Sequence, residues 1–207
     1  MTISARDGLA RLREGNQRFV SGLRSLDSML SHTRRASLAI SQHPFAIVLG
    51  CSDSRVPAEL VFDQGLGDLF VIRVAGNIVA PSQVGSVEFA AAAFGTSLAV
   101  VLGHTRCGAV SAAINEARNP AGHSPNLRSI VDRILPAVET LLATELRNDE
   151  EQLMRQAVRA NVRASVSHLR HGSALLEQLI DEGKLVVVGA EYSLETGEVD
   201  FFDGAVE

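Results

Sequence analysis

The chain has 207 residues, of which 46% are hydrophobic and 21% are charged, a balance typical of a globular domain with a full core and unlike a disordered chain. Its formal net charge of −5 disfavours a nucleic-acid partner held by phosphate contacts. We expect a single domain, residues 1–207. The first ten residues lack a charged segment followed by an apolar stretch, and the most apolar part of the chain is interrupted by polar residues. We therefore expect a cytoplasmic protein without a secretion signal or a membrane partner.

The first forty residues differ from the rest of the chain. Residues 6–19 carry Leu9, Leu12 and Phe19 at helical spacing but precede any strand-like run. Residues 21–41 are polar and show no regular pattern. We therefore expect residues 1–40 to form a helical arm that packs on the domain or on a partner subunit.

Short apolar runs rich in β-branched residues follow the arm. They span residues 45–50, 69–74, 98–103 and 185–189. Each run is continuous rather than alternating, which is typical of strands buried on both faces of a parallel sheet. Segments with helical character lie between these runs. They span residues 82–94, 107–118, 127–146 and 150–180, the last with a candidate break at His171 and Gly172. This alternation predicts an α/β fold with a mostly parallel sheet and flanking helices.

The chain has two cysteines, Cys51 and Cys107. In a cytoplasmic chain a structural disulfide is disfavoured, which leaves metal binding, redox chemistry or plain packing. Cys51 directly follows the first apolar run, His104 directly follows the third, and Cys107 lies three residues further on. Because ligands in open α/β sheets bind outside the carboxyl ends of the strands, we expect these three side chains to converge.

Two thiolates and one imidazole form a ligand set that zinc accepts. Three protein ligands leave the fourth tetrahedral position open, as in catalytic rather than structural zinc sites. The alternative is that the cysteines are small buried hydrophobic side chains, the commoner use of an isolated cysteine. Spacing alone leaves both interpretations open.

Asp53 and Arg55 follow Cys51 closely and allow three interpretations. A free Asp53 could coordinate the metal and close the site, whereas an Asp53 held by Arg55 would leave the site open and could accept a proton from bound water. The third interpretation is a loop salt bridge that only orders the turn. A phosphate-transferring thiol enzyme is disfavoured, because its Cys-x₅-Arg signature would need arginine where this chain has Pro57.

Two motifs together are highly specific. Residues 51–59 (CSDSRVPAE) and 103–109 (GHTRCGA) resemble the pair of signature motifs of the β-class carbonic anhydrases. The resemblance extends in the same order over most of the chain. It includes residues 15–19 (GNQRF), 67–73 (GDLFVIR), 75–77 (AGN) and 191–197 (EYSLETG).

This resemblance implies reversible hydration of carbon dioxide to bicarbonate and a proton, with one Zn²⁺ per chain held by Cys51, His104 and Cys107. It implies that Asp53 and Arg55 form a catalytic dyad, in which Arg55 orients Asp53 and Asp53 accepts a hydrogen bond from zinc-bound hydroxide. Asp53 would be a fourth zinc ligand only in a closed form of the site. The resemblance also implies an antiparallel edge strand, a homodimer or homotetramer, and an N-terminal arm that packs on the partner.

The chain departs from the family pattern at several positions. Some members bind bicarbonate in a regulatory pocket made by a Trp, an Arg and a Tyr. Here Arg73 is kept, but Val48 and Phe89 stand at the other two positions, so we predict no regulation through that pocket. Arg106, between two of the candidate ligands, could act on the metal site, or it could point to solvent or a subunit interface.

Two other classes of protein compete with the enzyme. The first is a catalytically silent relative that keeps zinc for structure, and the intact Asp53–Arg55 pair disfavours it. The second is a zinc-free thiol protein that uses Cys51 or Cys107 for redox sensing. Zinc content separates this last class from the enzyme.

Overall fold

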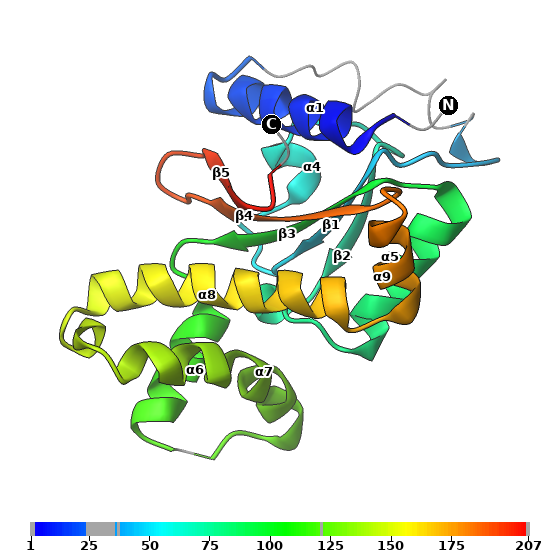
Figure 1. The fold of residues 1–207 in the computed structure, drawn as a ribbon. Helices are drawn as coiled ribbons and strands as arrows, with labels where there is room; N and C mark the ends of the chain where they lie inside the picture. The colour runs from blue at the N-terminus through cyan, green and yellow to red at the C-terminus, as the bar shows by residue number, and fades with distance from the viewer. Residues whose placement is uncertain (1–2, 24–35, 37, 121, 206–207) are drawn as a thin grey trace.

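The computed structural model describes residues 3–23, 36, 38–120 and 122–205. Its described strands form one five-stranded sheet of order β2-β1-β3-β4-β5 (Figure 1). They are β1 (Ala46–Gly50), β2 (Leu69–Arg73), β3 (Leu98–His104), β4 (Val186–Tyr192) and β5 (Val199–Asp203). The first four strands pair in parallel, and β5 pairs antiparallel to β4. The predicted α/β fold with an antiparallel edge strand is confirmed.

Helices surround this sheet. They are α1 (Ala5–Val20), α4 (Ala58–Val61), α5 (Pro81–Phe94), α6 (Gly108–Arg118), α7 (Pro125–Leu142), α8 (Glu150–His171) and α9 (Ala174–Asp181), with 3₁₀ helices η1 (Ala75–Asn77) and η2 (Glu145–Asn148). No helix in the described ranges is long and apolar enough to cross a membrane. Most of the stretch 21–41, predicted to be irregular, lies outside the described residues.

The structure confirms one predicted helix break and shortens another predicted helix. The break in residues 150–180 is confirmed, because the Ser173 side chain accepts a hydrogen bond from the N–H of Leu176 and starts α9 as an N-cap. Helix α7 ends at Leu142 rather than at residue 146. The Thr144 side chain instead caps the short helix η2 by accepting from the N–H of Leu146, which turns the chain out of the α7 axis.

The sheet is covered on both faces, which explains the continuous apolar runs. Val48 and Val100 pack in one cluster with Leu12 of α1, whereas Ile47 and Val101 pack in another with side chains of α5, α8 and α9. Successive side chains of a strand point to opposite faces, so every position of a doubly covered strand is apolar. Figure 1 shows α1 and α4 on one side of the sheet and α8 and α9 on the other.

Helix α1 also docks through a buried amide. Asn16 is 6% exposed and donates hydrogen bonds to the carbonyl oxygens of Val61 (3.1 Å) and Gly197 (2.8 Å). Its own oxygen accepts from the N–H of Val199 at 2.9 Å. The helix is thereby fixed to α4 and to the β4–β5 hairpin of its own chain. Packing of the arm on a partner subunit stays a prediction.

Gly15 marks the closest approach of α1 to the rest of the chain, and this gives a stability prediction. A Cβ there would lie 1.8 Å from the carbonyl oxygen of Phe62, a backbone atom that cannot rotate away. We predict that Gly15→Ala lowers the free energy of unfolding by about 1–3 kcal/mol through overpacking. Urea unfolding monitored by circular dichroism measures the change.

Gly85 of α5 provides the matched control. A Cβ at Gly85 would meet nothing within 4 Å. Gly85→Ala should therefore raise the free energy of unfolding by roughly 0.5–1 kcal/mol, because alanine is the better helix former. An equal response of the two variants would contradict the close contact at Gly15.

Candidate metal centre

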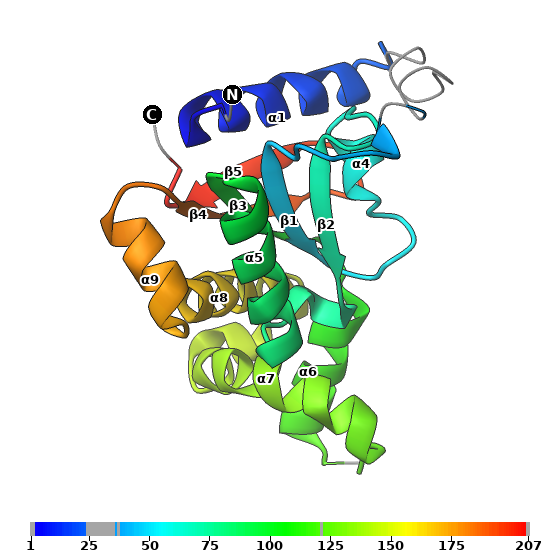
Figure 2. The ribbon, with the colours of Figure 1, turned by 90° about the vertical axis from the view of Figure 1, so that its right-hand side faces the viewer.

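The three candidate ligands come together at one edge of the sheet. Cys51 follows the last residue of β1, His104 ends β3, and Cys107 is the residue before α6. Because β1 and β3 are neighbouring parallel strands, their carboxyl ends share an edge. Figure 2 shows β1 beside β2, with α6 below them. All three side chains are buried, and their ligand atoms lie within 4.8 Å of one another. The convergence predicted from the strand ends is confirmed.

The His104 ring is oriented by the backbone. Its Nδ1 lies 2.9 Å from the carbonyl oxygen of Thr105, so Nδ1–H donates there and Nε2 keeps its lone pair. Nε2 is buried and has no hydrogen-bond partner among the described residues. A buried nitrogen without a partner is unfavourable unless a ligand uses its lone pair. This tautomer and the two nearby thiols fit a bound zinc ion.

The two thiols affect each other's ionisation. The hydrogen bond from Cys107 lowers the pKa of Cys51 to about 4, and the N–H of Gly76, 3.3 Å from Cys51 Sγ, acts in the same direction. The same contact, together with burial, raises the pKa of Cys107. Cys51 therefore ionises more readily than Cys107, and a divalent cation would stabilise both thiolates.

Gly76 lies where no larger residue fits. Its φ is +69°, in the left-handed region, and a Cβ there would lie 2.8 Å from Ile134 and 2.9 Å from Ala109. The glycine thus lets the chain turn sharply and point its N–H at Cys51. Residues 75–77 carry part of the family resemblance, but no sequence pattern predicts this role of Gly76.

Asp53 and Arg55 form a bidentate ion pair. Arg55 Nε donates to Asp53 Oδ1 at 2.9 Å, and Nη2 donates to Oδ2 at 2.7 Å. The backbone N–H of Arg55 also donates to Oδ1 at 3.0 Å. These hydrogen bonds hold the pKa of Asp53 well below its usual range. Oδ2 lies 3.9 Å from His104 Nε2, so the ionised carboxylate borders the ligand set.

The Arg73 side chain is hydrogen-bonded to the loop that carries Cys51. Its Nε donates to the Cys51 carbonyl at 3.0 Å, and its Nη2 donates to the Asp53 carbonyl at 2.6 Å. Val48 is fully buried, and Phe89 is half exposed in a group of three phenylalanines. The absence of bicarbonate regulation stays a prediction.

Arg106 forms an exposed ion pair with a residue outside the ligand set. Its Nε lies 2.7 Å from Glu195 Oε1, and the Arg106 side chain is 74% exposed. Of the alternatives left open by the sequence, this geometry favours a side chain directed to solvent. No sequence pattern had indicated its partner, because Glu195 lies in the β4–β5 turn, far along the chain.

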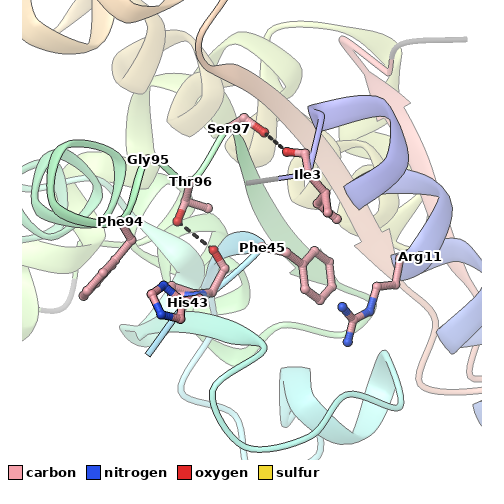
Figure 3. A pocket seen from close by; sticks show the side chains of 9 residues that line it. Ile3, Arg11, His43, Phe45, Phe94, Gly95, Thr96 and Ser97 are labelled. Carbon is pink, nitrogen blue, oxygen red and sulfur yellow. Dashed lines mark hydrogen bonds between the residues drawn. The ribbon is translucent and has the colours of Figure 1, made fainter. Parts of the chain in front are cut away.

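A pocket at the opposite end of the strands has no comparable set of metal-ligating side chains among its described residues. Figure 3 shows it between α1, the end of α5 and the residues that precede β1 and β3. Its hydroxyl groups are already paired within the chain. Thr96 donates to the carbonyl of Pro44 at 2.8 Å, and Ser97 donates to that of Ile3 at 3.0 Å. The candidate site is therefore at the other edge of the sheet.

Comparisons with known proteins agree with this geometry. The carbonic anhydrase family model matches residues 46–199. Carbonic anhydrase 2 of Mycobacterium tuberculosis is 41% identical over 189 residues, which covers 90% of this chain and 87% of that protein. A carbonic anhydrase of Mycolicibacterium smegmatis is 40% identical over 195 residues, with 91% and 89% covered.

Solved structures show the same likeness in three dimensions. The β-carbonic anhydrase CcaA superposes with a TM-score of 0.75 at 27% identity, over 97% of this chain and 94% of that chain. A tetrameric β-carbonic anhydrase of Sordaria macrospora superposes with a TM-score of 0.72 at 26% identity, over 81% and 85%. The family match spans all three converging side chains and most of the sheet, and the chain therefore belongs to the β-class carbonic anhydrases.

Proposed function

We propose that this chain catalyses the reversible hydration of carbon dioxide to bicarbonate and a proton, with one zinc ion held by Cys51, His104 and Cys107. The observation that carries the proposal is the convergence of these three buried ligand atoms within 4.8 Å, with an ionised Asp53 at their border. Three protein ligands leave the fourth tetrahedral position for water. When bound, zinc makes a water molecule nucleophilic near neutral pH, an effect for which carbonic anhydrases are the standard example.

The residues of the chain prepare this site in separate ways. Thr105 fixes the His104 tautomer, and the N–H of Gly76 stabilises the Cys51 thiolate. Two thiolates balance the charge of a divalent cation, so the loaded centre is neutral. Such a centre suits an uncharged substrate such as carbon dioxide.

Asp53 serves as a hydrogen-bond acceptor rather than a proton store. A group that keeps a proton needs a pKa near the working pH, and Arg55 holds that of Asp53 far below it. Oδ1 accepts two hydrogen bonds from Arg55, whereas Oδ2 accepts one and faces His104. The remaining lone pair of Oδ2 can orient the O–H of the attacking water, and the released proton passes to buffer.

Arg55 also keeps Asp53 away from the metal. A carboxylate without this pair is a good zinc ligand and would occupy the fourth position. We infer that Asp53 binds zinc only in a closed form, in which the bidentate pair is broken. The pair therefore has two functions, the orientation of water and the maintenance of an open site.

We further propose that the chains associate as dimers or tetramers. The tetrameric relative from Sordaria macrospora supports this state. The half-exposed Phe89 and its neighbours Phe70 and Phe94 give the chain an apolar patch that a second subunit could cover.

Zinc content tests the metal site. Protein purified without chelator should contain about one zinc per chain, as expected for a site with three protein ligands. His104→Gln should weaken zinc binding by more than the roughly 10- to 100-fold loss that outer partners of metal ligands cause. His43→Gln, at the opposite end of the sheet, is the matched control and should leave zinc content unchanged. Metal analysis that finds no zinc in the wild type would support the thiol redox protein instead.

Substitutions of the ion pair test the two functions of Arg55. Asp53→Ala should lower kcat/KM for carbon dioxide by about 10²-fold, because the attacking water loses its acceptor. Arg55→Ala should be at least as damaging, because the freed Asp53 can bind zinc. The double variant should then be more active than Arg55→Ala alone. Stopped-flow hydration assays measure all three, and a double variant less active than either single one would refute the closure by Asp53.

Bicarbonate provides a separate test. Because Arg73 already donates to two backbone carbonyls, we predict that bicarbonate inhibits only as a product, with hyperbolic kinetics at every concentration. Initial rates over a wide range of bicarbonate concentrations measure this dependence. Ordered bicarbonate on Arg73 in crystals soaked at high concentration would contradict the prediction.

A further inference from the structure

A single carboxylate in the β4–β5 turn contacts the whole segment between two candidate zinc ligands. The residues between His104 and Cys107 are Thr105 and Arg106. Glu195 Oε2 accepts a hydrogen bond from Thr105 Oγ1 at 2.8 Å, and Glu195 Oε1 lies 2.7 Å from Arg106 Nε. Each oxygen of Glu195 therefore holds one residue of this segment.

Thr105 connects this contact to the metal centre. Its carbonyl oxygen accepts from His104 Nδ1, and its N–H donates to the Tyr192 carbonyl at 3.0 Å. Its hydroxyl accepts from the N–H of Leu194 at 3.0 Å, so the hydroxyl proton is directed to Glu195. Every polar group of Thr105 has a partner, and three of its partners lie on the β4–β5 hairpin. The orientation of the His104 ring depends on where this hairpin holds Thr105.

Arg106 has a backbone conformation that needs support. Its φ is +55°, in the left-handed region that non-glycine residues rarely adopt. Such conformations persist only when the surrounding structure holds them. Arg106 directly precedes Cys107, so its backbone angles set the separation of the two ligands. The ion pair with Glu195 is a long-range contact that holds the Arg106 side chain.

We propose that Glu195 is a positioning residue of the metal centre, which fixes the geometry of His104 and Cys107 through Thr105 and Arg106. This inference rests on the proposed zinc site. Glu195 touches neither the metal position nor a ligand atom, so it acts only through the conformation of the segment. The Thr105 hydroxyl and the nearby Arg106 also lower the pKa of Glu195, which keeps the carboxylate ionised at neutral pH.

Zinc affinity measured against a chromophoric chelator tests the proposal. Glu195→Ala should weaken zinc binding by about tenfold, the lower end of the range for outer partners of metal ligands. Glu198→Ala is the matched control, because it removes the same charge from the same turn. The Glu198 carboxylate accepts from Thr196 Oγ1 and forms no hydrogen bond or ion pair with residues 104–107. The control should bind zinc as tightly as the wild type.

The visible spectrum of bound Co²⁺ reports the geometry of the ligands and does not change when only the overall stability changes. In Co²⁺-loaded protein, Glu195→Ala should shift or broaden the visible d–d bands, since the angles between His104 and the thiolates change. Glu198→Ala should leave the spectrum unchanged. An unchanged spectrum and unchanged zinc affinity in Glu195→Ala would overturn the inference.

Glu195→Gln keeps the proposal testable if the alanine variant does not fold. The amide retains an oxygen acceptor for Thr105 and loses the ion pair, so zinc binding should weaken by about threefold, the size of an exposed ion pair. Adding Arg106→Gln should cause no further loss, because the pair is already broken. If the losses of zinc affinity caused by the two substitutions add fully in the double variant, Glu195 and Arg106 act independently and the coupling is overturned.

The outcome for the wild type separates this inference from the proposed function. A wild type that binds no zinc would overturn both. Tight zinc binding by the wild type, with no loss in the Glu195 variants, would overturn the inference alone.

Discussion

The parallel pairing of β1 and β3 is the constraint on which the candidate metal centre depends. Gly50 and Leu102 are in register, so the chain leaves both strands at the same edge and delivers Cys51 and His104 side by side. The pairing is stabilised on both faces by apolar layers from helices α1, α5 and α8. A shift of one residue in this register would turn the buried side chains to the wrong faces and would separate the ligands.

At this edge of the sheet, backbone groups contact two of the candidate ligands. The N–H of Gly76 supports the Cys51 thiolate, and the carbonyl of Thr105 fixes His104. Arg73 in turn holds the carbonyls of the loop that carries Cys51 and Asp53. These supports come from the stretch at the end of β2 and from the turn after β3, so the ligand geometry depends on more than one loop at this edge of the sheet.

In the proposed function, the ion pair at Asp53 determines how the open metal position is used. Because Arg55 is two residues away and binds both oxygens, the pair is formed within one turn of chain. In the proposed mechanism, this ionised and oriented acceptor would favour attack by water on an uncharged substrate. The same pair would prevent the carboxylate from becoming a ligand. Orientation and exclusion would therefore have one physical cause.

The local part of this structure followed from the sequence alone. Continuous apolar runs predicted the buried parallel strands, and residues at their ends predicted the ligand trio, because strand direction fixes where a chain emerges. The Asp53–Arg55 pair was also visible, since its members are two residues apart, although its bidentate geometry was one of three alternatives. Tertiary structure alone decided the long-range contacts. Asn16 reaches a carbonyl 181 residues away, and Glu195 reaches Thr105 across 90 residues. These residues come into contact only when the helices and the hairpin pack on the sheet. A local sequence pattern therefore cannot predict such contacts.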